Sequence, residues 1–494
     1  MKLTDLLKGT STSKVVGYIE DIEILDITLS SRHAKKGSLF VAQKGENFDG
    51  HFFVEEAIIN GAVCIVVEKH LQAYNIPQII VKSTRRAIAT LAATFYGNAH
   101  KNLKFIGVTG TNGKTSCALF LTEMLNNANL PCAFIGTTGA CFMGEEFASH
   151  LTTPDPLVLH KLLKQFLDLG AKYVCMEVSA HAIKLEKIFN IDFEVGILTN
   201  ITQDHLDYFK TMNAYSKTKL SWLQSDKVKT IVINSDDKYA QKLLGKKLET
   251  ISFGLENPAD VFAVNIENNP LGFSFTMNLL DNVISCHTSL IGTFNLYNIL
   301  AVATSAFCIG LPLSDIKKSI ALLSPPKGRF NTLMFRENKT IIVDFAHTPD
   351  GLENALKSAR KICTGKLYAL FGCGGDRDKL KRPIMGRIAE ENSDFVILTS
   401  DNPRFEKPEN ILDEIEKGFL GHNYIKIADR KLAIFKLVEC LAPNDVAVVC
   451  GKGGENYQDI NGIKLPYDDF DEIKKSAKTI LDEVPRTQTK ELLC

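Results

Sequence analysis

The residues best suited to chemistry form a glycine-rich turn, Thr-Gly-Thr-Asn-Gly-Lys-Thr at 109–115, which follows the apolar run 103–108. This order predicts a strand, a turn and the start of a helix. Backbone N–H groups of such a turn and the helix N-terminus form a concave site for phosphate oxygens. Lys114 would reach the β- and γ-phosphates, and the Thr115 hydroxyl would hold magnesium. The turn is a shortened phosphate loop, since Val108 stands where its first glycine would be. We therefore expect ATP binding.

Polar residues follow two further apolar runs. Glu177 lies in Met-Glu-Val-Ser at 176–179, and Asp204 and His205 follow a later run. Ligands of open α/β sheets bind beyond the carboxyl ends of the strands. Glu177 near a phosphate loop suits magnesium, although such a residue alone is more often ion-paired. His205 is a candidate metal ligand or substrate-positioning group. The lysines of Tyr-Ser-Lys-Thr-Lys at 215–219 are equally consistent with a solvated helix face.

Polar or glycine-rich turns also follow four apolar runs in the last third of the chain. Arg377 and Arg404 could pair with carboxylates, and Asp401 and Glu455 with an amine. The pattern predicts a binding face for a small zwitterion. The four turns are Val-Asp-Phe-Ala-His-Thr-Pro (343–349), Gly-Cys-Gly-Gly-Asp-Arg-Asp (372–378), Ser-Asp-Asn-Pro-Arg (400–404) and Gly-Lys-Gly-Gly-Glu (451–455).

The elements that must position these residues form three blocks, and the fold class expected is α/β. Residues 1–98 predict a small α/β domain. Residues 99–326 predict a parallel sheet with covered faces and a short antiparallel set at 261–290. Residues 327–494 predict a Rossmann-like, doubly wound domain, with a hinge at 325–329. Strands are expected at 104–108, 133–136, 173–178, 195–199, 230–234, 340–345, 366–371, 395–399, 424–428 and 446–450.

Composition limits the function classes. Lys plus Arg and Asp plus Glu each number 57, so no global field favours nucleic acid or an anionic membrane. No apolar run approaches the ~18 residues needed to span a bilayer. The N-terminus lacks the apolar region of a secretion signal. The twelve cysteines include no C-x-x-C pair, which argues against a disulfide framework or a zinc site. We expect a cytoplasmic protein.

Together these motifs resemble those of the Mur ligases of peptidoglycan synthesis, over essentially the whole chain. The turn Asp-Asn-Pro-Arg at 401–404 resembles the diaminopimelate-adding members rather than the lysine-adding ones. The other shared motifs are Leu-Ser-Ser-Arg (29–32), Thr-Gly-Thr-Asn-Gly-Lys-Thr (109–115), Met-Glu-Val-Ser (176–179), Asp-His-Leu-Asp-Tyr (204–208), Gly-Thr-Phe-Asn-Leu-Tyr-Asn (292–298) and Val-Asp-Phe-Ala-His-Thr-Pro-Asp (343–350).

The resemblance implies an ATP-dependent, ADP-forming amide ligase. Such an enzyme joins meso-diaminopimelate to the D-glutamate side-chain carboxylate of UDP-N-acetylmuramoyl-L-alanyl-D-glutamate through an acyl phosphate. The implied domains are a UDP-muramoyl substrate-binding domain at 1–98, a central ATP-binding domain at 99–326 and a C-terminal amino-acid-binding domain at 327–494. The implied cofactors are ATP and Mg²⁺. The partners expected are these small molecules alone, without nucleic acid or membrane insertion, and the chain is expected to be a monomer.

The resemblance also implies roles for individual residues. ATP would contact Gly110, Thr111, Asn112, Gly113, Lys114, Thr115, Asn298, Arg329, Asp344 and His347. The muramoyl substrate would contact Leu29, Ser31, Thr152, Thr153, Ser179 and Lys187. Diaminopimelate would contact Arg377, Asp401, Asn402, Pro403, Arg404, Gly451 and Glu455. Catalysis would involve Lys114, Glu177, His205 and Lys219, and magnesium would be held by Thr115, Glu177, His205 and Lys219, the last as a CO₂-derived carbamate.

Some positions depart from the family pattern. Gly454 stands in place of a histidine, Leu185 and Lys187 in place of Gln and Arg, and Leu151 where an Asn is often found. Contacts to the muramoyl substrate are therefore open at Leu185 and Lys187. The alternatives are a lysine-adding Mur ligase, a folylpolyglutamate synthetase, a P-loop switch protein and an inactive scaffold. A folate ligase would leave residues 1–98 and the turn 401–404 unexplained, and no Asn-Lys-x-Asp motif supports a guanine-nucleotide switch.

Overall fold

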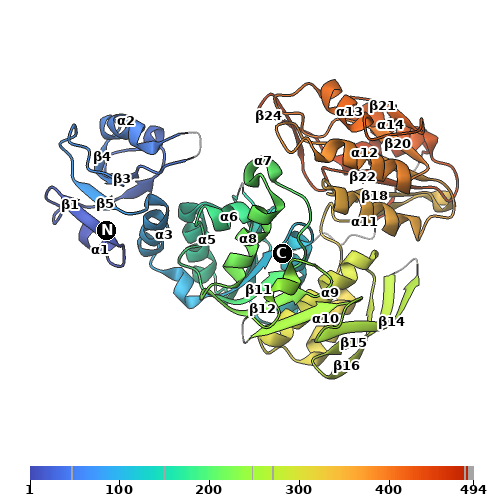
Figure 1. Ribbon diagram of the computed structural model, residues 1–494, viewed down its shortest axis with the longest axis horizontal. Helices are drawn as coiled ribbons and strands as arrows, with labels where there is room; N and C mark the ends of the chain where they lie inside the picture. The colour runs from blue at the N-terminus through green and yellow to red at the C-terminus, as the bar shows by residue number, and fades with distance from the viewer. Residues whose placement is uncertain (46–47, 150, 247–248, 270–271, 483–484, 488–494) are drawn as a thin grey trace. The chain divides into compact units, whose positions relative to one another are not determined.

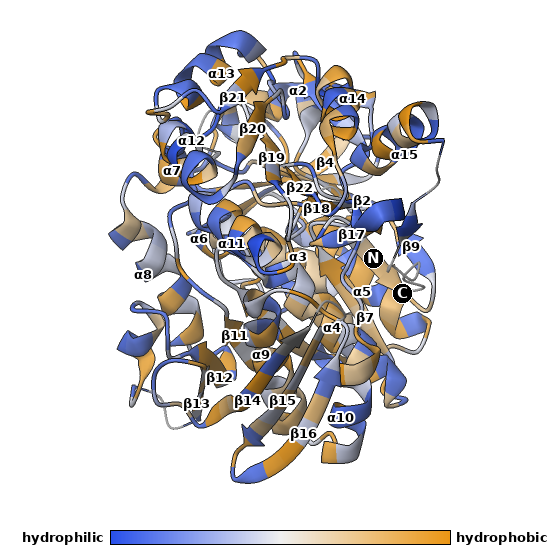
Figure 2. Cartoon of the chain, turned by 90° about the vertical axis from the view of Figure 1, so that its right-hand side faces the viewer, coloured by the Kyte–Doolittle hydropathy of each residue, from blue (hydrophilic) through white to orange (hydrophobic). Residues whose placement is uncertain are grey.

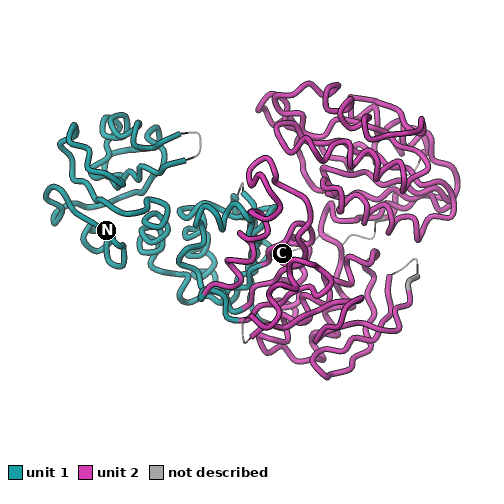
Figure 3. Tube along the Cα trace, in the orientation of Figure 1, with its two compact units in different colours: residues 1–107, 130–194, 226–229 teal, residues 108–129, 195–225, 230–494 magenta. Residues whose placement is uncertain are grey.

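The computed structural model describes residues 1–45, 48–149, 151–246, 249–269, 272–482 and 485–487 (Figure 1). The chain forms two compact units (Figure 3). The first unit comprises Met1–Gly107, Leu130–Glu194 and Asp226–Lys229, and the second comprises Val108–Asn129, Val195–Ser225 and Thr230–Cys494. Among the described residues, no helix has the length and apolar character needed to cross a bilayer.

The N-terminal part of the first unit is a five-stranded sheet with helices packed on it. Its strand order is β1-β5-β4-β3-β2. Apolar residues make β3 and β4 almost wholly buried, and Ile88 and Leu91 of α3 share one core with Leu39 and Val66 of these strands. The elements are α1 (Leu3–Leu6), β1 (Thr12–Val16), β2 (Asp26–Thr28), β3 (Ser38–Val41), α2 (Val54–Ile59), β4 (Ala62–Val67), β5 (Gln78–Val81) and α3 (Thr84–Phe95).

The remainder of the first unit carries a parallel strand pair and a short hairpin. β10 pairs in parallel with β7, and β8 and β9 extend that edge in antiparallel fashion. The sequence does not predict the hairpin, because its strands are short and partly polar. The elements are β7 (Cys132–Gly136), β8 (Gly139–Phe142), β9 (Glu145–Phe147), α5 (Pro156–Asp168), β10 (Tyr173–Glu177) and α6 (Ala180–Lys184).

The second unit begins at the end of β6 and contains most of the remaining strands of the central sheet. The three predicted antiparallel strands are present, and they extend an edge of this sheet in the order β16-β15-β14-β13-β12-β11. The elements are β6 (Lys104–Thr109), α4 (Lys114–Asn127), β11 (Phe193–Leu198), α7 (Leu206–Phe209), α8 (Met212–Leu223), β12 (Val228–Asn234), β13 (Thr250–Gly254), β14 (Val261–Asn269), β15 (Gly272–Leu279), β16 (Asn282–Thr288), α9 (Thr293–Cys308) and α10 (Leu313–Leu322).

The C-terminal part of the second unit is a seven-stranded sheet in the order β21-β20-β19-β22-β18-β17-β25. Two hydrophobic cores form between this sheet and its helices. The first contains Leu352 of α11 and Met385 of α12, and the second contains Leu437 of α14 and Ile473 of α15. Figure 2 shows apolar strands between helices of mixed polarity. The elements are β17 (Asn331–Met334), β18 (Thr340–Asp344), α11 (Pro349–Arg360), β19 (Leu367–Phe371), α12 (Lys381–Asn392), β20 (Phe395–Leu398), α13 (Pro408–Glu416), β21 (Tyr424–Lys426), α14 (Arg430–Cys440), β22 (Val446–Cys450), β23 (Tyr457–Ile460), β24 (Ile463–Pro466), α15 (Asp469–Ile480) and β25 (Arg486–Thr487).

The predicted α/β class, with a parallel central sheet, an antiparallel extension and a doubly wound C-terminal part, is confirmed. Helices α10 and α15 and strands β13 and β17 are additions that the sequence patterns do not predict. The domain boundaries at 98 and 326 stay predictions.

Candidate active site

The glycine-rich turn lies between β6 and α4, as the sequence predicts. Helix α4 begins at Lys114, so the N–H groups of its first turn point toward the glycine-rich segment. Together they form the cradle expected for phosphate oxygens. Asn298 of α9 lies against this turn, because a Cβ atom on Gly113 would be 2.7 Å from its Oδ1 atom.

Lys114 folds back over the turn that precedes it. Its Nζ atom donates to the carbonyl oxygen of Gly110 at 2.9 Å and to that of Thr111 at 2.7 Å. The Thr115 hydroxyl accepts a hydrogen bond from Nη2 of Arg329 at 3.0 Å. The second unit therefore brings together three of the residues predicted to contact ATP, namely Lys114, Thr115 and Arg329.

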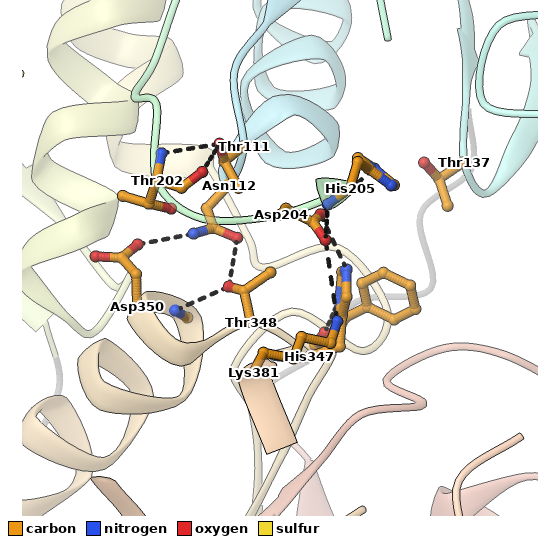
Figure 4. Close-up of polar contacts among 12 residues, drawn as sticks. Thr111, Asn112, Thr137, Thr202, Asp204, His205, His347, Thr348, Asp350 and Lys381 are labelled. Carbon is orange, nitrogen blue, oxygen red and sulfur yellow. Dashed lines mark hydrogen bonds and ion pairs between the residues drawn. The ribbon is translucent and has the colours of Figure 1, made fainter. Parts of the chain in front are cut away.

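Asn112 connects the turn to the segment that follows β18 (Figure 4). Its Nδ2 atom donates to Oδ2 of Asp350 at 2.7 Å, and its Oδ1 atom accepts from the Thr348 hydroxyl at 3.3 Å. Its backbone N–H donates to Oδ1 of Asn200 at 2.9 Å. The turn is thereby tied to the loop after β11 and to the start of α11.

Asp344 ends β18 and is held by backbone groups. Its carboxylate accepts from the N–H of Phe330 at 2.7 Å and from that of Ala346 at 2.8 Å. Burial raises the pKa of Asp344, although the charge of Arg329 opposes this. Asp344 therefore fixes the backbone next to Arg329, which in turn reaches the phosphate loop.

Lys219 lies on α8 with its side chain almost completely buried. Its Nζ atom donates to the carbonyl oxygen of Gly110 at 2.6 Å and lies 4.8 Å from the centroid of the Tyr215 ring. Burial and the charge of Lys114 lower the pKa of Lys219 well below its ordinary value, although Asp204 opposes them. The environment therefore favours the neutral amine, and the solvated-face alternative for this lysine is wrong.

Asp204 is the buried centre of a cluster of titratable side chains that the sequence predicts only in part (Figure 4). Its carboxylate lies 3.4 Å from Nε2 of His205, 3.9 Å from Nε2 of His347 and 3.9 Å from Nζ of Lys381. Burial raises the pKa of Asp204, but the charges of His205, Lys381 and His347 outweigh it and lower the pKa below its usual range. The carboxylate therefore stays ionised and holds residues of three segments together.

Glu177 lies in the first unit, at the end of β10, and is fully buried. Its Oε1 atom accepts from the backbone N–H of Thr137 at 2.8 Å, and its Oε2 atom from the Thr137 hydroxyl at 3.1 Å. Gly136 is required beside it, since a Cβ atom there would lie 2.3 Å from Oε1. The carboxylate is thus held in one orientation.

Three of the predicted muramoyl-binding residues gather around Glu177 in the first unit. The Thr153 hydroxyl donates to the Glu177 carbonyl oxygen at 2.8 Å and lies 3.2 Å from the Ser179 hydroxyl. The Ser179 hydroxyl also accepts from the N–H of Ala182 and so caps α6. The Thr152 hydroxyl lies 3.0 Å from that of Thr137, which itself contacts Glu177.

The other predicted muramoyl-binding residues have their own partners in the first unit. Lys187 pairs with Asp155 at 2.9 Å, so the lysine that replaces the family's arginine is already engaged by a carboxylate. The Ser31 hydroxyl donates to Oε2 of Glu56 at 2.6 Å, and the half-buried Leu29 packs on the N-terminal core.

The predicted acceptor-binding turns meet at the carboxyl ends of β19, β20 and β22. Nδ2 of Asn402 donates to Oε2 of Glu455 at 2.9 Å. Gly451 has φ +108°, and a Cβ atom on it would lie 2.3 Å from Oδ2 of Asp401. The structure therefore brings together Asp401, Asn402, Gly451 and Glu455.

Arg404 and Arg377 differ in how firmly they are held. Nη1 of Arg404 donates to the Gly375 carbonyl oxygen at 2.8 Å, and its Nε lies 3.8 Å from Oδ2 of Asp459. Pro403 contacts the same loop, since a Cβ atom on Gly375 would lie 1.9 Å from the Pro403 carbonyl oxygen. Arg377 is exposed, and its Nη1 atom donates only weakly to the Asp376 carbonyl oxygen at 3.5 Å.

The sequence predicts no role for Lys381, Arg382 and Lys452, which are buried in this region. Nη1 and Nη2 of Arg382 both bond to the Glu406 carboxylate, and Nη2 also reaches the Gly374 carbonyl oxygen at 3.1 Å. Each of these cations lies within or near one of the acceptor-binding turns. Its structural role follows from its burial, and that burial depends on residues distant in the sequence.

The departure at Gly454 has a steric explanation. A Cβ atom on Gly454 would lie 2.8 Å from the Lys327 carbonyl oxygen, and one on Gly328 would lie 1.8 Å from the Gly454 nitrogen. The predicted hinge segment thus approaches the turn 451–455 more closely than a histidine at 454 would allow.

The predicted magnesium ligands are divided between the units. Thr115, His205 and Lys219 belong to the second unit and Glu177 to the first. Across the part of the chain that the structure describes, no cluster of three or more His, Cys, Asp or Glu side chains is arranged to hold a metal ion. The predicted set differs from such a cluster, because it relies on a hydroxyl and a modified lysine.

Three family models match successive parts of the chain. The model of the Mur ligase family catalytic domain matches residues 23–96, that of the Mur ligase middle domain residues 108–306, and that of the Mur ligase glutamate ligase domain residues 328–453.

Individual relatives are similar over nearly the full length. The UDP-N-acetylmuramoyl-L-alanyl-D-glutamate–2,6-diaminopimelate ligase of Bacillus velezensis is 40% identical over 492 residues, which are 98% of this chain and 99% of that protein. A solved structure of a ligase with the same name is 30% identical, covers 97% of this chain and 99% of its own, and superposes with a TM-score of 0.69. The MurF ligase of Thermotoga maritima in complex with ADP is 22% identical, with coverages of 87% and 95% and a TM-score of 0.62, and shows the shared fold.

Proposed function

Because the chain belongs to the Mur ligase family, we propose that it joins meso-diaminopimelate to the D-glutamate side-chain carboxylate of UDP-N-acetylmuramoyl-L-alanyl-D-glutamate. The reaction uses ATP, forms ADP and supplies a precursor of peptidoglycan. The observation that carries the proposal is the position of Arg404. Its guanidinium is held by the loop 372–378, and it lies two residues after Asn402, which donates to Glu455. We further propose that the enzyme works in the cytoplasm as a monomer.

The phosphate loop supports the use of ATP. Lys114 and Arg329 contribute two cations at the glycine-rich turn, where the nucleotide phosphates would lie. Magnesium, when bound, neutralises phosphate charge. It would be held by Thr115, His205 and Lys219 of the second unit, and Glu177 is the fourth expected ligand. Three of these four donors, the Thr115 hydroxyl, the Glu177 carboxylate and the Lys219 carbamate, are oxygen ligands that suit this hard cation, and His205 is the one nitrogen donor of the set.

Carbamylation of Lys219 is supported by its environment. Carbon dioxide reacts with a neutral amine, and the low pKa of buried Lys219 supplies that form. The nitrogen lone pair forms a bond to the carbon of CO₂, one C=O π pair moves onto oxygen, and the nitrogen releases one proton to solvent. The product is an anionic carbamate, which offers oxygen ligands where an ammonium would repel the metal.

The ligation then proceeds in two steps. A D-glutamate carboxylate oxygen attacks the γ-phosphorus, the bond to the β-phosphate bridging oxygen breaks, and ADP leaves. The neutral amine of the acceptor attacks the acyl-phosphate carbon, and a tetrahedral intermediate forms. The nitrogen loses one proton to solvent, the bond from carbon to the phosphate oxygen breaks, and phosphate leaves as the amide forms. Lys114 stabilises the charge on the transferred phosphoryl group, and Thr153 and Ser179 position the muramoyl peptide.

The acceptor is set by the extra carboxylate of diaminopimelate. Arg404 can pair with that group in bidentate fashion, whereas lysine lacks it. A site built for a charged partner rejects an analogue without it by a factor on the order of 10⁴. This argument favours diaminopimelate over the lysine-adding alternative, and the similarity over the whole chain disfavours a folylpolyglutamate synthetase or a P-loop switch.

The proposal is tested by incubating the protein with ATP, magnesium, the UDP-muramoyl dipeptide and meso-diaminopimelate. We expect one phosphate and one amide product per ADP, identified by mass. ATP hydrolysis without amide product would contradict the proposal.

A further inference from the structure

Lys452 directly follows the glycine that comes after β22, and its side chain is fully buried. A lysine is seldom buried unless its ammonium is paired. Its Nζ atom lies 2.9 Å from Oδ1 of Asn402 and 2.9 Å from Oε2 of Glu455. The ammonium also lies 5.4 Å from the centroid of the Tyr457 ring.

The two contacts close a triangle, because Nδ2 of Asn402 donates to the same Glu455 oxygen at 2.9 Å. Oδ1 of Asn402 accepts a second hydrogen bond from the N–H of Asp459 at 2.9 Å. The oxygen and one N–H of the Asn402 amide are therefore engaged by the protein itself. Within the described part of the chain, no group donates to Oε1 of Glu455, while Oε2 receives two hydrogen bonds.

We propose that Lys452 is a positioning residue for the acceptor amine. It fixes Asn402 and Oε2 of Glu455, and thereby turns Oε1 of Glu455 toward the acceptor. The identity of the acceptor rests on the proposed function, whereas the role of Lys452 rests on the triangle. Asn402 then holds Glu455 through one N–H of its amide, in addition to the contact with the acceptor that is predicted for it.

The test compares Lys452→Met with Lys464→Met in steady-state assays that vary each substrate in turn. Lys464 is a matched control, because its Nζ atom lies 4.2 Å from the centroid of the same Tyr457 ring but the residue is exposed on β24. We expect Lys452→Met to raise KM for diaminopimelate by roughly 30-fold, with KM for ATP within about twofold of its original value. Lys464→Met should leave the KM of every substrate within about twofold.

Lys452→Gln provides a second variant that retains a neutral donor and should give an intermediate KM. Thermal unfolding is measured for each variant, so that a loss of folding is recognised. If Lys452→Met does not fold, the KM values of Lys452→Gln decide the test. An unchanged KM for the acceptor in a folded Met or Gln variant would overturn the proposal, as would an equal rise in KM for ATP. If the wild type uses another amino acid, the proposed function fails, and the same comparison with that acceptor still decides the role of Lys452.

Discussion

The Nζ atom of Lys219 lies 2.6 Å from the carbonyl oxygen of Gly110, directly at the phosphate loop. A charged ammonium in this place would compete with the cation that a triphosphate requires. Burial and the charge of Lys114 lower its pKa, so the amine is available for reaction with CO₂. This hydrogen bond joins α8 to the phosphate loop and places the amine proposed to react with CO₂ beside that loop.

Lys219→Met should lower kcat by more than about 100-fold, because the variant cannot form a carbamate. Lys217→Met on the same helix is the control, since Lys217 is exposed, and it should retain activity. Phosphate release measures the rates, and NMR with isotopically labelled bicarbonate detects the carbamate. A fully active Lys219→Met enzyme would contradict this prediction.

Tyr215→Phe should weaken the attachment of the phosphate loop to α8. The Thr111 hydroxyl lies 3.1 Å from the Thr202 carbonyl oxygen and 3.2 Å from the Tyr215 hydroxyl, which can act as a donor to it. Removing that donor should lower the free energy of unfolding by about 1 kcal/mol. Urea unfolding measures the change, and no change would show that the hydrogen bond contributes nothing.

Arg382→Met should be severely destabilising, because the guanidinium is fully buried and pairs with Glu406 and Glu414. The two carboxylates stay partly exposed, so the cost comes from the lost charge-assisted hydrogen bonds and is about 1.5–3 kcal/mol. Arg360→Met removes an exposed pair with Asp394 and should cost less than about 1 kcal/mol. Equal losses of unfolding free energy in the two variants would contradict the assigned role.

The stability should also depend on pH through Glu406. The hydrogen bond from Arg382 lowers the pKa of Glu406 from 4.5 to about 2. A lowered folded-state pKa stabilises the protein above the unfolded value, and this contribution is lost as pH falls from 4.5 toward 2. Unfolding free energies measured across that range should fall less steeply for Arg382→Met than for the wild type. Identical slopes would contradict the pairing.

The chemistry-bearing turns could be predicted well from the sequence, because strand-turn patterns and glycine motifs are local signals. The turn 109–115 follows β6, and the turns after β18, β19, β20 and β22 are where they are expected. The roles of Asp204, Arg382 and Lys452 could not be predicted, since they depend on burial by partners far along the chain. The charge of Arg377 and its place in a glycine-rich turn predict contact with the carboxylate of the acceptor. The residue is exposed, and this contact stays a prediction.

The most direct test of the account compares meso-diaminopimelate with L-lysine as acceptors for the wild type and for Arg404→Met. We predict that kcat/KM of the wild type favours diaminopimelate by a factor on the order of 10⁴, and that Arg404→Met loses most of this preference. A wild-type enzyme that uses lysine as well as diaminopimelate, or an Arg404→Met variant that keeps the full preference, would contradict the account.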